Sequence, residues 1–272
     1  MSGILRRLVK SLVPPVALSF YRRFFPAPKT WIWEGSYSSF EAVPAVNPDY
    51  DYDARVQEMM VQCQSMLNQA REGCLPLYWH TAIATLGGVL SANGKVRVLD
   101  FGGALGTGFI QLSASLQRDV EISYDVVDLP HMCEAGRELF EDDTRIRFHT
   151  SLDAVLAPVD ILYLNSVLQY IPDYESLLKK LASVRAQWIL LARVASGDFP
   201  PFVARQMNLS GQIVPHWFLN RGDVVGILSS CGYRLLSDTL DNHQYDMTNY
   251  PVEQQAGRQR HMLFVRSEGA MS

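Results

Sequence analysis

The 272-residue sequence has few cysteines and little ordered spacing of metal ligands, which excludes several classes of protein. Its four cysteines form no C-x-x-C pair, and its six histidines show no ligand spacing. Neither a zinc site nor a disulfide framework is therefore predicted, and no metal is expected. Scattered free cysteines are typical of a reducing compartment, so we expect a cytoplasmic protein.

Long apolar runs are also missing. The apolar stretch 12–20 contains Pro14 and Pro15 and is shorter than the roughly 20 residues that a membrane-spanning helix needs. We expect neither a transmembrane helix nor a secretory signal peptide.

Acidic residues do not occur before Glu34, although six basic residues do. Of the 24 basic residues in the chain, 18 therefore remain from Glu34 onward, against all 28 acidic residues. An acidic body argues against nucleic acid as a partner, because binding it needs lysine and arginine to neutralise phosphates.

The basic residues of segment 1–30 form one face of a predicted amphipathic helix. Its apolar face falls within 4–12, and Pro14 ends it. Two alternatives remain for this helix. It lies on an anionic membrane surface, which gives a peripheral contact at the inner membrane, or it packs on the body or on a second subunit of a homodimer.

Segment 31–94 is predicted to be a cap of aromatic residues and helices, with helices at about 54–70 and 78–90. The aromatic side chains at 31–37 either close over a pocket as a lid or hold the extension by ordinary packing, and we favour packing. Alternating aspartates at 49–53 permit a divalent metal site of the glycosyltransferase kind. Their position before a helix favours capping.

From position 95 the pattern changes to short apolar strands alternating with helices, and 95–272 is predicted to be one α/β domain. Two late strands without a helical crossover, at about 233–240 and 261–266, predict an antiparallel edge pair beside a parallel sheet. The expected strands of the parallel part are 96–101, 121–127, 146–149, 160–164 and 188–194, and the expected helices are 109–117, 131–140, 174–184 and 221–230.

A glycine-rich turn follows the first of these strands, in the run Val98–Gly108. Glycines there let the backbone turn tightly and approach a ligand, while the first amides of the next helix favour an anionic group. No G-x-G-x-x-G of a dinucleotide site occurs in the run. A P-loop fails because Phe109 and Ile110 stand where lysine and serine or threonine are required.

Asp100 and Asp128 instead favour S-adenosylmethionine as the cofactor. A carboxylate beside a pyrophosphate would be repelled, whereas Asp100 can face the ammonium of a methionine tail while glycine amides bind its carboxylate. A second acid is needed for the ribose hydroxyls at the end of the next strand, about 20 residues past the glycines. Asp128 lies there.

The run Val98–Gly106 and the acid at 128 resemble the class I S-adenosylmethionine-dependent methyltransferases, over roughly 96–266. The resemblance implies a Rossmann-like methyltransferase sheet. The segments 33–35, 99–106, 168–171 and 215–218 resemble, more narrowly, a family of bacterial methyltransferases linked to surface-polysaccharide gene sets. That implies O-methylation of a carbohydrate or another small molecule.

The resemblance also implies a set of cofactor-binding residues. Many relatives place an acid next to the adenine, whereas this sequence has the hydroxyls of Thr150 and Ser151 at that place. The set is Asp100, Gly102, Gly103, Gly106, Asp128, Leu129, Thr150, Ser151 and Asn165.

For catalysis we predict His216 as the base, in a segment expected above the strand ends, with Gln169 and Tyr170 orienting the acceptor. The alternative for His216 is a packed or hydrogen-bonded residue. The alternative for the whole chain is a non-catalytic partner with this fold in polysaccharide assembly. Nicotinamide-dependent reduction is disfavoured by the missing fingerprint, and no G-x-S-x-G or Cys–His pattern supports hydrolysis.

Overall fold

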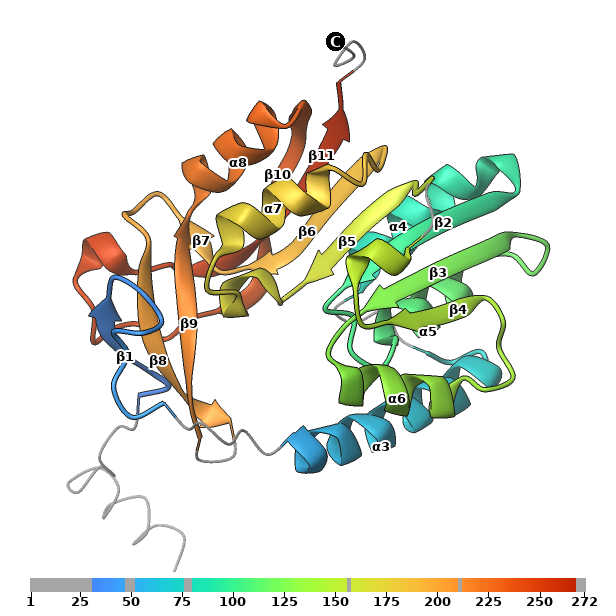
Figure 1. The fold of residues 1–272 in the computed structure, drawn as a ribbon, viewed down its shortest axis with the longest axis horizontal. Coiled ribbons are helices and arrows are strands. Elements are labelled where there is room, and N and C mark those ends of the chain that lie inside the picture. Colours follow the sequence, from blue (N-terminus) through green and yellow to red (C-terminus); the bar gives the residue numbers. More distant parts are fainter. Residues whose placement is uncertain (1–30, 47–51, 76–79, 156–157, 210–211, 268–272) are drawn as a thin grey trace, which may run out of the picture.

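The computed structural model describes residues 31–46, 52–75, 80–155, 158–209 and 212–267. They form a seven-stranded and a four-stranded sheet (Figure 1). The predicted basic helix of segment 1–30 and the aspartates at positions 49 and 51 lie outside these residues. In the part of the chain that is described, no helix combines the length and the apolar character needed to span a membrane.

Five strands of the larger sheet are parallel and confirm the predicted α/β pattern. Their order is β4 (Ile146–His149), β3 (Glu121–Val127), β2 (Lys95–Phe101), β5 (Ile161–Asn165) and β6 (Trp188–Val194). This is a doubly wound order, in which the chain moves outward from β2 in one direction and then in the other. Its topological switch point lies between β2 and β5, where such folds bind ligands.

The last two strands complete the sheet beyond β6 and confirm the predicted antiparallel edge pair. β11 (Arg258–Arg266) pairs antiparallel with β6, and β10 (Tyr233–Gln244) pairs antiparallel with β11 at the outer edge. The Rossmann-like sheet expected from the sequence is therefore present, although both late strands are longer than predicted.

Helices cover both faces of this sheet. One face carries α4, α5 and α6, against which α3 also packs, and the other carries α7 and α8 (Figure 1). Their bounds are α3 (Tyr52–Arg71), α4 (Thr81–Leu90), α5 (Thr107–Ser115), α6 (Pro130–Leu139), α7 (Tyr174–Ala182) and α8 (Arg221–Ser230).

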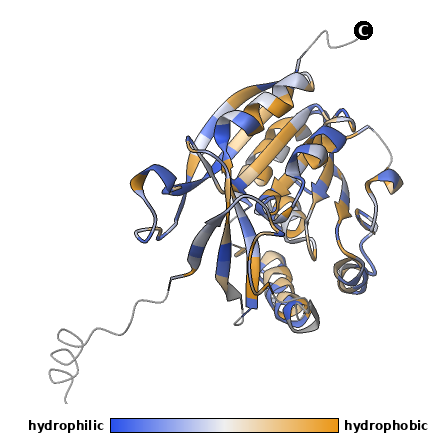
Figure 2. Cartoon of the chain, turned by 60° about the vertical axis from the view of Figure 1, so that its left-hand side comes forward, coloured by the Kyte–Doolittle hydropathy of each residue, from blue (hydrophilic) through white to orange (hydrophobic). Residues whose placement is uncertain are grey.

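Alternation along the strands divides the core into two layers. In β2, Val96 and Val98 pack in the cluster with α5 and α6, whereas Leu99 packs in the cluster with α7 and α8. Successive side chains of a strand point to opposite faces, so a strand covered on both sides is apolar almost throughout. In Figure 2 the central strands of this sheet are largely orange, whereas the helices around them carry both blue and orange.

The smaller sheet was not predicted. Its order is β1 (Trp33–Tyr37), β8 (Phe202–Leu209), β9 (Gln212–Asn220) and β7 (Ser196–Gly197). β8 and β9 form an antiparallel hairpin between β6 and α8, a region that the sequence indicated only as a connection. A core of aromatic side chains, named here the aromatic cluster, fills one side of it: Trp33, Phe199, Phe202, Phe218, Tyr245 and Tyr250.

The segment predicted as a cap of aromatic residues and helices also contains a strand, β1, which was not predicted. β1 pairs antiparallel with β8 in the smaller sheet, whereas α3 and α4 pack on the larger one. Trp33 is 6% exposed within the aromatic cluster, so it packs there as expected rather than standing over a pocket. The boundaries at 30 and 94 stay predictions, and the segment between them is shared by two sheets.

Candidate functional site

The main cavity lies at the carboxyl ends of β2, β5 and β6 and has a volume of about 690 Å³. Side chains of α3 line one of its walls. A second cavity of about 620 Å³ shares Arg55, Gly102 and Tyr170 with it and continues to the end of β3. Together they occupy the switch point of the sheet, where polar groups from different strands converge.

The glycine turn between β2 and α5 forms the floor of the main cavity. Gly102 has a φ of +71°, and its amide donates to the Val127 carbonyl at 2.9 Å. A Cβ at Gly103 would lie 2.5 Å from Cγ of Asp100. Larger residues are excluded because the turn passes so close to the strand it has just left.

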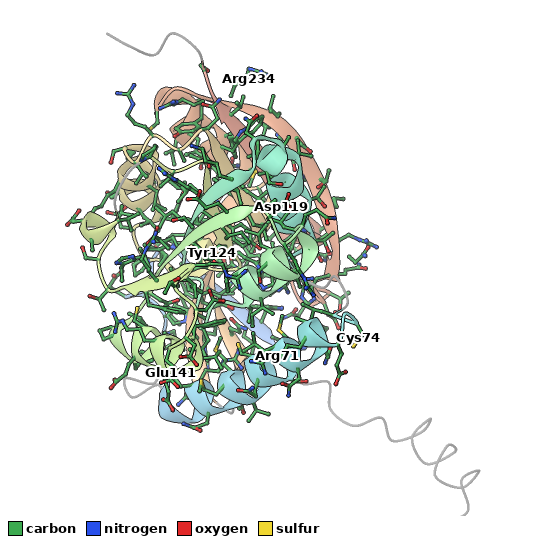
Figure 3. All side chains as sticks on the ribbon, turned by 90° about the vertical axis from the view of Figure 1, so that its right-hand side faces the viewer. Arg71, Cys74, Asp119, Tyr124, Glu141 and Arg234 are labelled. Carbon is green, nitrogen blue, oxygen red and sulfur yellow. The ribbon has the colours of Figure 1, made fainter. Side chains whose placement is uncertain are left out.

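Asp100 is the penultimate residue of β2, a buried acidic side chain that lines the main cavity. It is 1% exposed; Oδ2 accepts a 2.7 Å hydrogen bond from Tyr124, which lies inside the sheet (Figure 3), while Oδ1 has no partner among the described groups. Burial raises the pKa of Asp100 to about 7, and the charge of Asp128 adds to this, while the Tyr124 bond opposes it. Such an oxygen is suited to a cationic ligand.

Asp128 follows β3 and lines the second cavity. Its Oδ2 accepts from the Ala104 amide and its Oδ1 from the Leu129 amide, both at 2.7 Å. Burial raises the pKa of Asp128, and these two bonds oppose the rise. They fix the carboxylate against the glycine turn, and each oxygen keeps capacity for a further donor such as a hydroxyl.

His80 is a cavity residue that the sequence did not reveal. Its Nδ1 lies 2.9 Å from the Tyr163 hydroxyl and 3.2 Å from Nδ2 of Asn165, and its Nε2 lies 3.0 Å from Oγ1 of Thr107. An amide NH₂ only donates, so Nδ1 accepts and Nε2 carries the proton. Burial, with the charge of Arg193 second, lowers the pKa of His80 to about 4. This ring is therefore neutral and fully engaged.

Most of the predicted cofactor residues converge on the two cavities. Asp100, Gly102, Gly103 and Asn165 line the main cavity, and Gly102, Asp128, Leu129 and Thr150 line the second. Gly106 and Ser151 line neither of them. Gly106, with a φ of +80°, precedes the first residue of α5, and the Ser151 side chain accepts from the Asp153 amide.

The two predicted orienting residues are adjacent in the chain but differ in place. Tyr170 lines both cavities, and its hydroxyl donates to Oε1 of Gln206 at 2.9 Å. Gln169 is 1% exposed behind the cavity wall, where its Nε2 donates to Oγ of Ser166 at 3.0 Å. Only Tyr170 is in a position to contact a ligand directly.

His216 lies in β9 and lines neither cavity, which differs from its predicted place above the strand ends. It is 1% exposed, with ring centroids of Trp33 and Phe218 at 4.5 Å and 4.9 Å. Burial lowers its pKa to about 3, so the ring is neutral. These contacts favour the packing alternative, because hydrogen-bonded access to an acceptor is what a base requires.

Arg193, also missed by the sequence analysis, brings a positive charge to the same cavity. Three of the five described non-glycine residues with positive φ line it, namely Ala104, Ser166 and Arg193. Left-handed backbone at non-glycine residues is costly and concentrates at functional sites. A sequence signal for such residues does not exist, because tertiary contacts impose the conformation.

Comparison with known proteins gives resemblance in chain path alone. No protein-family model matches the sequence, and no curated protein matches it. Similar solved structures include a Synechocystis magnesium protoporphyrin IX methyltransferase with bound S-adenosylmethionine, at 13% identity, 96% coverage of both chains and a TM-score of 0.48. Another is a Burkholderia thailandensis 1,6-didemethyltoxoflavin-N1-methyltransferase, at 14% identity, 83% and 94% coverage and a TM-score of 0.45.

Proposed function

We propose that the chain is a methyltransferase that uses S-adenosylmethionine as cofactor and methylates a small-molecule acceptor. The observation that carries this proposal is the buried Asp100 carboxylate, which presents a partnerless oxygen to the cavity beside a glycine turn. A second acid, Asp128, follows the neighbouring strand β3 and accepts a hydrogen bond from the Ala104 amide of the same glycine turn. A ligand with a cationic amine, a carboxylate and a ribose complements this set of groups.

The described residues fit such a cofactor from end to end. Oδ1 of Asp100 and Oδ1 of Asn165 are both buried acceptors without a partner, as an ammonium requires. In the glycine turn the amides of Gly102, Ala104 and Gly106 already donate within the protein, which leaves those of Gly103 and Leu105 for the carboxylate. Asp128 would accept from the ribose hydroxyls, and Leu129, Thr150 and Val167, which line the same cavity, would contact the base.

When bound, the cofactor would supply a methyl group on a sulfonium; the acceptor would take this methyl in line and lose its own proton, and S-adenosylhomocysteine would leave. The protein then has to align the acceptor and exclude water. α3 covers the main cavity, and Tyr170 stands on the wall shared by both cavities, where it orients the acceptor. We extend the proposal to O-methylation of a carbohydrate or another small molecule, which rests on the sequence resemblance, and to a cytoplasmic location, which rests on the scattered free cysteines.

Calorimetric titration with S-adenosylmethionine and with S-adenosylhomocysteine tests the proposal. We expect both to bind, and Gly103→Ala to lower the affinity by about tenfold or more, because the added Cβ would displace the Asp100 carboxylate. Gly226→Ala in α8 is the matched control, since a Cβ there meets nothing within 4 Å.

Three outcomes would count against the proposal: no binding of either compound, equal affinity in both variants, or tighter binding of a nicotinamide dinucleotide. Turnover is followed as formation of S-adenosylhomocysteine. Binding without turnover on any glycan or small-molecule acceptor would favour the non-catalytic partner protein instead.

A further inference from the structure

Arg193 is directed into the main cavity by a β-bulge near the end of β6. β11 pairs Arg260 with Val194 and Met262 with Leu191, so Ala192 and Arg193 together oppose a single residue. Arg193 itself has a φ of +55°. Bulges re-aim a side chain at the edge of a site, and a left-handed arginine persists only where the surrounding structure imposes it.

A buried polar chain holds the guanidinium in place. Nε of Arg193 donates to Oε1 of Gln259 at 3.0 Å, and Nε2 of Gln259 donates to the Tyr245 hydroxyl at 2.9 Å. Gln259 is 4% exposed. This tether uses Nε, so it orients the plane of the guanidinium.

The position of Arg193 separates it from the two acids of the proposed cofactor site. Asp100 and Asp128 stand at the ends of β2 and β3, whereas Arg193 stands near the end of β6, on the other side of β5. Neighbouring strands are about 4.8 Å apart, so β6 lies roughly 10 Å from β2 and away from β3. Asn165, which we also assign to the cofactor, ends β5 and pairs with Ala192, so Arg193 borders the cofactor site on the side away from Asp128, where we place the acceptor.

The charge of Arg193 is felt across this part of the cavity. Burial lowers the pKa of His80 and of His243, with the charge of Arg193 second. For Asp241 on β10, burial raises the pKa, while hydrogen bonds from His243 and His261 and, least of all, the charge of Arg193 lower it. Oδ2 of Asp241 also accepts a hydrogen bond from Nε2 of His261 at 2.8 Å. Arg193 is therefore the cationic group in a mixed set that also contains two histidines and one carboxylate.

We propose that the acceptor is an anionic small molecule, whose carboxylate or phosphate monoester is bound by Arg193 at the β6 side of the main cavity. This inference rests on the proposed function, because the cofactor defines which part of the cavity the acceptor enters. The planar fork of arginine matches both oxyanions, which are the shared chemistry of the ligand. Arg193 is then a specificity-determining residue.

The test uses the full chain saturated with S-adenosylhomocysteine, titrated with benzoate, phenyl phosphate and the neutral benzyl alcohol. Benzoate or phenyl phosphate should bind at least tenfold more tightly than benzyl alcohol. Arg193→Gln should remove this preference, and Arg193→Lys, which keeps the charge but loses the fork, should retain part of it. Arg234→Gln, at an exposed position on β10 (Figure 3), is the control and should bind like the wild type.

Separate outcomes distinguish this inference from the proposed function. If S-adenosylhomocysteine fails to bind the wild type, the proposed function fails first. If it binds wild type and Arg193→Gln within about twofold, the cofactor site is independent of Arg193, as inferred. Three outcomes would overturn the inference. They are a tenfold loss of cofactor affinity in Arg193→Gln, anion affinities of this variant equal to those of the wild type, and no preference of the wild type for the anions over benzyl alcohol. Circular dichroism verifies that both Arg193 variants fold.

Discussion

A buried histidine lies beside the main cavity and another beside the aromatic cluster, and the two differ in the hydrogen-bond partners of their ring nitrogens. His80 lines the cavity, and all its ring nitrogens have partners. His216 lies against aromatic rings, and its Nδ1 has no partner among the described groups. Burial lowers the pKa of both. A shifted pKa therefore does not identify a functional histidine, whereas access to a cavity does.

The same comparison explains where unpaired polar atoms are tolerated. Oδ1 of Asp100 and Oδ1 of Asn165 border an open cavity, where a ligand can supply the missing donors. Nδ1 of His216 has no such access, so its unpaired state only costs stability. Polar groups at the strand ends are thus available to bind a ligand, whereas the aromatic cluster contributes to the stability of the fold.

The largest effect that separates the two regions is expected for Trp33→Ala. Removing this ring from the aromatic cluster should lower the free energy of unfolding by about 4 kcal/mol, since aromatic truncation in a core leaves a cavity. Affinity for S-adenosylhomocysteine should be unchanged below the unfolding transition. Chemical denaturation and calorimetry provide the two measurements.

Val252→Ala, at a side chain that is 82% exposed, is the control for Trp33→Ala and should change neither quantity. A loss of cofactor affinity in a folded Trp33→Ala protein would contradict the separation of the binding cavity from the stabilising aromatic cluster. It would favour the lid alternative for the aromatic residues at 31–37.

A smaller effect is expected for His216→Leu, and it depends on pH. The folded pKa of about 3 lies below the unfolded value of about 6.5, so the wild type is fully stabilised above pH 6.5 and loses stability as pH falls. This term amounts to about 2 kcal/mol between pH 7 and pH 5. His216→Leu should lose that share of the pH dependence while keeping turnover.

Denaturation at pH 7 and pH 5 measures the difference, and the share that His80 contributes remains in both proteins as an internal reference. An unchanged pH dependence would show that His216 is not buried as described. Loss of turnover in a folded variant would restore His216 as the catalytic base.

The acidic residues of the cavity could be predicted from the sequence, whereas the smaller sheet could not. Asp100 and Asp128 could be placed because a parallel strand and the turn after it are local patterns, and strand ends meet at one edge of the sheet. The hairpin of β8 and β9 could not, because its apolar run 213–219 lacks alternation and its partner β1 is remote in sequence. Arg193 and His80 reach the cavity through a bulge and through packing, which depend on tertiary contacts.

The smallest expected effect concerns the main cavity and is a pH dependence of cofactor affinity that Asp100 causes. Asp100 has a pKa of about 7 in the free protein, so below pH 7 it is protonated and loses its attraction for an ammonium. Affinity for S-adenosylhomocysteine should therefore fall about tenfold from pH 8 to pH 6, about 1.4 kcal/mol. Asp100→Asn should bind more weakly at pH 8 and lose this dependence. Equal slopes in both proteins would show that the ammonium is held elsewhere.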